Sequence, residues 1–142
     1  MDHAELFNEM PFVRSLGIEV TVATDGHAEG RLTVTDDHTS NPETGVVHGG
    51  ATFTLADTVG DAAVVSLTGT LVPTIDMRID YLAPVTGDVT AEADVIRDGG
   101  SLAVVEVELF DCEETHVATA HGVYKIGGGS NESVWRRRSA VE

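Results

Sequence analysis

The stretch Val47-His48-Gly49-Gly50-Ala51-Thr52-Phe53-Thr54-Leu55-Ala56-Asp57-Thr58 decides how this chain folds. It predicts an apolar helix, rich in small residues, that opens on a histidine and two glycines and carries a carboxylate, Asp57, in its middle. An ionised carboxylate in a buried helix is costly unless it is paired, hydrogen-bonded or used. Glycines let a ligand approach the backbone closely, and the N–H groups at a helix start favour negative charge. Together these features predict a site for a reacting carbonyl.

The rest of the chain shows strand patterns on both sides of this helix. The helix itself is expected from about Gly49 to Leu67, because apolar residues cover most of its circumference. A short amphipathic helix is expected before it, from Ala4 to Phe12, ended or bent by Pro11. Alternation and turn signals predict six strands, at residues 18–24, 28–34, 74–82, 89–96, 102–110 and 116–126.

This order of elements predicts an α+β fold. A helix, a hairpin, a long buried helix and a meander of four strands are typical of an antiparallel sheet curled around one central helix. The remaining sheet edge is expected to pair with another subunit. We expect a single domain over residues 1–126, and a disordered tail over 127–142, because that segment opens with Gly127-Gly128-Gly129-Ser130 and is otherwise polar.

The charge of the chain is strongly negative. The sequence holds 24 Asp and Glu residues against 8 Lys and Arg residues, which gives a formal net charge of −16. Such a surface repels nucleic acid and anionic membranes, so neither is expected as a partner. Dense like charge is tolerated where salt screens it, and a salt-loving cytoplasm is therefore one hypothesis; a mesophilic protein that is merely acidic is the other.

Cysteine usage and hydropathy favour a cytoplasmic protein. The single cysteine, Cys112, excludes an intrachain disulfide. The acidic start of the chain lacks a signal-peptide pattern. No apolar run is long enough to span a bilayer, since Asp57 and Asp61 interrupt the best candidate.

The segment N-P-E-T-G-V-V-H-G-G-A-T-F-T-L-A-D-T at residues 41–58 resembles the hotdog-fold thioesterases. The similarity is greatest to the acyl-CoA thioesterases of the phenylacetic-acid-degradation type. It extends from about Phe12 to Ile126 and includes P-T-I-D-M-R-I-D-Y-L-A-P at residues 73–84, Gly87-Asp88 and the turn from Arg97 to Leu102. The resemblance implies a curved antiparallel sheet wrapped around the helix, and a homodimer or a dimer of dimers.

The resemblance also implies roles for individual residues. Asp57 matches the carboxylate that acts as nucleophile or as general base on water, and Gly49 matches the residue whose backbone N–H polarises the thioester carbonyl. His48 matches a histidine that holds the thioester or the helix entrance. Thr74 matches a Ser or Thr supplied by the facing subunit. Asn41 resembles an asparagine that places water, but it lies seven positions before His48 where the family usually has six.

Other candidate residues concern binding. Gly50 is a candidate for substrate contact beside Gly49, and Arg97 with Gly99 is a candidate for the CoA phosphates, ahead of Arg136-Arg137-Arg138 in the tail. No metal site is expected. His116 and His121 are odd-spaced on a strand and so point to opposite faces, and Asp36-Asp37-His38 is more typical of a capped turn.

We therefore expect an acyl-CoA thioesterase that needs no metal or organic cofactor. The chemistry agrees, because a thioester carbonyl needs its oxyanion stabilised and needs either activated water or a nucleophile. Two alternatives stay open: a hotdog enoyl-CoA hydratase or dehydratase, and a non-catalytic acyl-CoA-binding module. Phe53, Leu55, Met77 and Tyr81 are candidates to line an acyl pocket, but aromatic, short aliphatic and medium-chain acyl groups all remain open.

Overall fold

A computed structural model describes residues 2–127 of the chain. Its elements are two short helices, α1 (Ala4–Asn8) and α2 (Pro11–Ser15), strands β1 (Ile18–Thr24) and β2 (His27–Leu32), a 3-10 helix η1 (Asp36–His38), short strands β3 (Thr39–Asn41) and β4 (Val46–Val47), the long helix α3 (Gly49–Thr68), and strands β5 (Thr74–Tyr81), β6 (Val89–Asp98), β7 (Leu102–Asp111) and β8 (His116–Lys125). The tail predicted to be disordered, with Arg136-Arg137-Arg138, lies outside the described residues except for Gly127.

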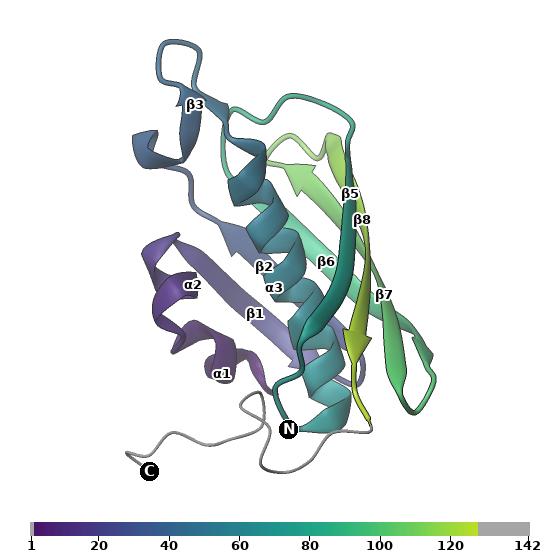
Figure 1. Cartoon of the computed structure of the whole chain (residues 1–142). Helices are drawn as coiled ribbons and strands as arrows, with labels where there is room; N and C mark the ends of the chain where they lie inside the picture. Colours follow the sequence, from purple (N-terminus) through teal and green to yellow (C-terminus); the bar gives the residue numbers. More distant parts are fainter. Residues whose placement is uncertain (1, 128–142) are drawn as a thin grey trace.

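The large sheet has six antiparallel strands in the order β1-β2-β6-β7-β8-β5. The predicted meander of four strands is therefore wrong in one connection, because β5 pairs with β8 and not with β6. Both sides of β6 are already occupied, by β2 and β7. The segment from Leu82 to Asp88 is accordingly no hairpin turn; it carries the chain from one edge of the sheet across to β6 (Figure 1).

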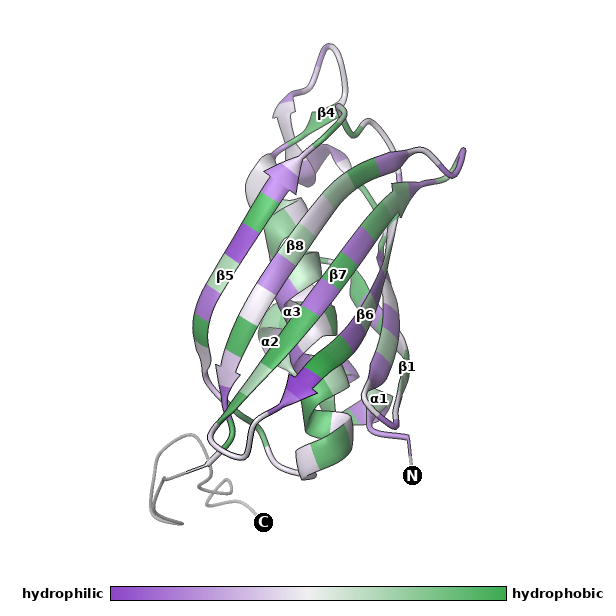
Figure 2. Ribbon diagram, turned by 90° about the vertical axis from the view of Figure 1, so that its right-hand side faces the viewer, coloured by the Kyte–Doolittle hydropathy of each residue, from purple (hydrophilic) through white to green (hydrophobic). Residues whose placement is uncertain are grey.

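Helix α3 packs against the concave face of this sheet and forms the centre of the core (Figure 1). Ten of its residues are buried, among them Leu55, Val59 and Val65. The helix ends at Gly69, whose φ of 73° is the left-handed conformation typical of a helix C-cap. On the sheet, hydrophobic and hydrophilic residues alternate along the strands, as Figure 2 shows. The predicted α+β fold with a curved antiparallel sheet around one long helix is confirmed. Within residues 2–127 no helix is both long and apolar enough to cross a membrane.

The two edge strands of the sheet, β1 and β5, differ in what lies beside them. Edge strand β1 is covered by the start of the chain: the amide of Asn8 bonds both the N–H and the carbonyl of Val20, at 2.8 Å each, and Asp2 and His3 bond Ala23. Pro11 begins α2 and does not simply end the first helix, because proline suits the first helical position. Edge strand β5 has no strand partner on its outer side among the described residues. The open edge of the sheet is therefore β5.

Candidate active site

The start of α3 leaves one backbone donor unused. His48 is the N-cap, and its Nδ1 accepts the N–H of Gly50 at 2.8 Å. The neutral imidazole therefore carries its proton on Nε2. The carbonyl of His48 accepts the N–H of Ala51 at 3.0 Å. The N–H of Gly49, in contrast, has no acceptor within residues 2–127. His48 thus caps the helix, and Gly49 presents a free donor where the helix dipole is positive.

The middle of α3 holds a carboxylate between two hydroxyl groups. Thr74 donates its hydroxyl to Oδ1 of Asp57 at 2.9 Å, and Tyr124 places its hydroxyl 3.2 Å from the same oxygen and 3.1 Å from the backbone carbonyl of Asp57. The expectation that Thr74 faces Asp57 from the other subunit is wrong for this contact. Thr74 begins β5, directly beside α3 of its own chain, so the two side chains meet within one copy.

A second acid lies one turn further along the same face of α3. Asp61 is partly buried, and its Oδ1 is enclosed with no hydrogen-bond partner among the described residues. Burial, and then the negative charge of Asp57, raise the pKa of the Asp61 carboxyl well above its usual range. The environment of Asp61 therefore disfavours its charged form, next to the hydrogen-bonded Asp57.

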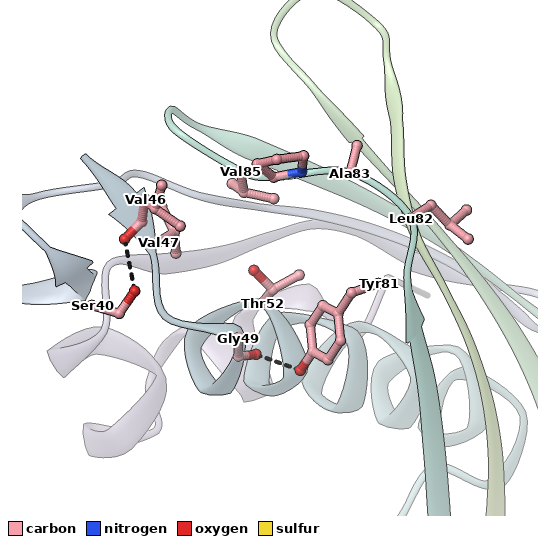
Figure 3. A pocket seen from close by; sticks show the side chains of 10 residues that line it. Ser40, Val46, Val47, Gly49, Thr52, Tyr81, Leu82, Ala83 and Val85 are labelled. Carbon is pink, nitrogen blue, oxygen red and sulfur yellow. Dashed lines mark hydrogen bonds between the residues drawn. The ribbon is translucent and has the colours of Figure 1, made fainter. Parts of the chain in front are cut away.

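An apolar cavity of about 500 Å³ lies beside the helix start. It is lined by α3, the β3–β4 hairpin and the segment after β5, with Ser40, Val46, Val47, Gly49, Thr52, Tyr81, Leu82, Ala83, Pro84 and Val85 around it (Figure 3). Tyr81 donates its hydroxyl to the carbonyl of Gly49 at 2.7 Å, and partial burial raises the pKa of this phenol. A Cβ at position 49 would stand 3.0 Å from the Tyr81 ring, so the contact favours glycine there.

The remaining predicted residues are dispersed. Asn41 is exposed and its side-chain oxygen accepts the N–H of Glu43 at 3.0 Å, which makes it a turn residue beside the cavity. Arg97 and Gly99 lie at the other end of the sheet from Tyr81, because Arg97 pairs with Val104 near the start of β7. Within residues 2–127 no three His, Cys, Asp or Glu side chains cluster as a metal site would require.

The two parts of the site are far apart in one chain. Gly49 and Asp57 are eight residues apart on α3, or about 12 Å at a rise of 1.5 Å per residue. One carbonyl group cannot touch both.

Tyr124 and the Gly49 contact of Tyr81 were not predicted from the sequence. The glycines at positions 60 and 122 are the sequence feature that could have pointed to Tyr124. A Cβ at Gly60 would stand 2.6 Å from the Tyr124 hydroxyl, so the phenol occupies the space that a side chain would need.

The fold and the site define a class: a hotdog protein with an open backbone donor at its helix start and an acid on the same helix. Comparison with known proteins specifies the family, because residues 44–118 match the thioesterase superfamily. The chain belongs to this superfamily, as the resemblance in the sequence predicts.

Individual relatives agree with this assignment. A protein of Halobacterium salinarum whose name assigns it to the esterases is 36% identical over 78% of this chain and 81% of its own length. The medium/long-chain acyl-CoA thioesterase YigI of Escherichia coli is 29% identical, over 83% and 86%. Among solved structures, the E. coli PaaI protein from the phenylacetic acid degradation operon is 27% identical, with a TM-score of 0.79 over 89% of this chain and 91% of that chain.

Proposed function

We propose that this protein hydrolyses the thioester bond of an acyl-CoA to a free acid and CoA. The observation that carries the proposal is the pairing, on one helix, of a free Gly49 N–H at the positive end with a hydroxyl-held Asp57 in the middle. The first stabilises the oxyanion that forms on the thioester carbonyl, and one such donor contributes about 3 kcal/mol to lowering the barrier. The second activates water or attacks the carbonyl carbon itself.

The reaction balances with these groups alone. If Asp57 is the base, it takes a proton as a water oxygen bonds to the carbonyl carbon, and the C–S bond then breaks. The CoA thiolate that leaves takes up the proton that Asp57 holds, which restores the carboxylate, and the free acid remains. If Asp57 is the nucleophile, an anhydride forms first and water cleaves it. No cofactor is needed in either route.

The complete site requires two copies of the chain. Two copies joined through the open β5 edge, running antiparallel, would place the start of one α3 beside the middle of the other. Ile75, Tyr81 and Leu82 support this contact, because each is a large apolar residue about half exposed along or just after β5. The same arrangement brings the Arg97 and Gly99 end of one copy towards the cavity of the other. A homodimer, or a tetramer of two such dimers, is the proposed active unit.

The cavity beside Gly49 is proposed to take the acyl group. Its lining from Val46, Val47, Thr52 and residues 82–85 is predominantly apolar, which suits a hydrocarbon or aromatic acyl chain. Relatives named for medium/long-chain acyl-CoA and for the phenylacetic acid operon support a substrate panel that includes both classes.

The proposal is tested by thiol release from a panel of acyl-CoA esters in molar KCl. Phenylacetyl-, benzoyl- and short- to medium-chain thioesters are assayed with the wild type and with Asp57→Asn, which keeps the shape of the side chain. We expect turnover by the wild type and a loss of at least 1,000-fold in kcat for Asp57→Asn, on the order seen when an essential catalytic group is removed. The oligomer, checked by light scattering, should be intact in both. Binding of CoA esters without turnover by the folded wild type would contradict the proposal.

The acidic surface supports adaptation to high salt in a cytoplasmic setting. Acidic side chains such as Glu19, Glu92, Asp94 and Glu106 are exposed on the strands of the large sheet, as the hydrophilic bands of Figure 2 illustrate. At molar salt the screening length falls to about 3 Å, so their repulsion is suppressed. Activity and folding should decline at low salt and recover in molar KCl. Salt-independent stability would contradict this part of the proposal.

A further inference from the structure

The buried phenol of Tyr124 contacts the carboxylate of the site. Tyr124 lies on β8 with 0% of its surface exposed. Its hydroxyl is 3.2 Å from Oδ1 of Asp57, the same atom that accepts the hydroxyl of Thr74 at 2.9 Å. No described residue donates a hydrogen bond to Oδ2 of Asp57. Oδ1 therefore contacts two hydroxyl groups, whereas Oδ2 has no hydrogen-bond donor among the described residues.

The surrounding sequence makes room for this phenol at two positions. A Cβ at Gly60 on α3 would stand 2.6 Å from the Tyr124 hydroxyl, and a Cβ at Gly122 on β8 would stand 2.9 Å from the ring. Such approaches do not occur between real side chains, so both positions must lack one. A phenylalanine would fill the same core volume without a polar atom. The hydroxyl is therefore not explained by packing alone, and its described hydrogen-bond contacts are with Asp57 and with Thr74, the other hydroxyl beside Oδ1.

We propose that Tyr124 is a positioning residue for hydrolysis: with Thr74 it holds Oδ1 of Asp57, so that Oδ2 is the oxygen presented to water or to the thioester carbon. The inference rests on the proposed function. A carboxylate that accepts two hydroxyl donors on one oxygen cannot rotate freely about its last bond, so Oδ2 has a fixed direction. Geometry held within about 0.5 Å is what general-base or nucleophilic attack requires.

The phenol stays a donor under all working conditions. Burial, followed by the charges of Asp57 and Asp61, raises the pKa of the Tyr124 hydroxyl well above its ordinary value. The charged or titratable groups facing it are Asp57 and Asp61 from α3, and no cation of the described chain is paired with either acid. Tyr124 therefore does not take the proton that hydrolysis releases; it only orients the group that does.

The alternative is that the hydroxyl merely satisfies the backbone carbonyl of Asp57, 3.1 Å away. In that case it would stabilise the helix and leave catalysis unaffected. The two roles differ in what a Tyr124→Phe variant does to kcat. They also differ in how that variant combines with Thr74→Val, because two residues that hold the same oxygen show non-additive effects.

The experiment compares wild type, Tyr124→Phe, Thr74→Val and the double variant, all as the full oligomer, with the acyl-CoA that the wild type turns over fastest. We expect Tyr124→Phe to lower kcat by about 10- to 100-fold and to change KM by less than about threefold, since it removes orientation of the reacting group and no substrate contact. The double variant should lose less than the product of the two single losses. Thr74→Ser, which keeps the hydroxyl, is the conservative variant and should restore most of the kcat that Thr74→Val loses.

The outcomes separate this inference from the proposed function. If Tyr124→Phe keeps kcat within twofold of the wild type, whatever its melting temperature, Tyr124 has no positioning role and the hydrolytic function stands. Strictly multiplicative losses in the double variant would also overturn a shared hold on Oδ1. A wild type that folds and hydrolyses no thioester overturns both proposals, which is a different result from either of these.

Discussion

The start and the middle of α3 use their polar groups in opposite ways. At the start, His48 takes up the N–H of Gly50 and leaves that of Gly49 open, next to an accessible apolar cavity. In the middle, Asp57 is held by two hydroxyls, one of them from the core. The first region is prepared to bind a charge that develops during reaction, and the second to hold a charge already present. The two groups lie about 12 Å apart on the helix, so the proposed reaction pairs each of them with the other group of a second copy.

At the helix start, a large effect is expected from removing the open donor. Gly49→Pro deletes its N–H, and proline suits this first helical position because the preceding His48 is extended, at φ −61° and ψ 133°. Gly49→Ala is the matched control, because it adds the same Cβ against Tyr81 and keeps the N–H. We expect kcat of the proline variant to fall about 100- to 1,000-fold below that of the alanine variant. Equal activity would remove Gly49 from the oxyanion site.

A complementation assay tests whether the two regions act across copies. Asp57→Asn and Gly49→Pro, each nearly inactive alone, are refolded together in equal amounts. Half of the dimers should be mixed, and each mixed dimer then has one intact site of two, so activity should recover to roughly a quarter of wild type. Tagged heterodimers isolated by affinity provide the direct measurement. Recovery no greater than the sum of the two variants would place both groups of one site in one chain.

A third effect concerns the enclosed acid one turn from Asp57. Because the pKa of Asp61 is raised on folding, the native state keeps a proton that the unfolded state has lost. The free energy of unfolding therefore falls as pH rises from the ordinary carboxyl range towards the raised pKa, by up to about 1.4 kcal/mol per pH unit. Asp61→Asn should remove this fall, and its advantage over wild type should grow with pH across that window. Urea titrations of both proteins at pH 4 to 8 and fixed salt measure the free energy of unfolding. If it varies with pH in the same way for wild type and Asp61→Asn, the prediction is contradicted.

The smallest effect is expected on the outer face of the sheet. His27 bonds Asp94 at 2.8 Å and Glu29 at 3.0 Å, and the hydrogen bond to Asp94 is the main cause that raises the pKa of this imidazole. Its stabilisation is present below the unfolded pKa and is lost as pH rises through the folded pKa. Since the side chain is partly exposed, His27→Gln should destabilise by less than about 1 kcal/mol at pH 5 and not at pH 9. Thermal melts of the wild type and His27→Gln at pH 5 and pH 9 measure this difference in stability. A larger destabilisation at pH 9 than at pH 5 would contradict the prediction.

The sequence predicted the elements that depend on local pattern. The long helix with Asp57 in its middle, the six long strands to within two residues at each end and the fold class follow from periodicity, glycines and turn signals. The short strands β3 and β4 were not predicted. The pairing of β5 with β8 was not predicted. It arises because β6 pairs with β2, a strand far from it in the sequence, which leaves no free edge of β6 for β5. Periodicity places a residue on a face but does not say which strand lies beside it.

The site residues that lie in one continuous motif were predictable from the sequence, whereas those that come from distant segments were not. His48, Gly49 and Asp57 lie on one helix, so their spacing is visible in the sequence. Tyr124 comes from β8, 67 residues after Asp57, and reads as an ordinary core aromatic until the hydroxyl is seen beside the carboxylate. The helix-capping role of His48 likewise depends on which ring nitrogen faces Gly50, and residue identity does not specify that.

The space around Tyr124 has a consequence for redesigning this protein. Gly60 and Gly122 interlock with Tyr124 so closely that a Cβ at either position would force the core around the phenol to shift. The cavity rim at Leu82, Ala83 and Pro84 has no such interlock and lies at or near the surface. Engineering of acyl preference should therefore diversify Ala83 and Pro84 and leave Gly60 and Gly122 untouched.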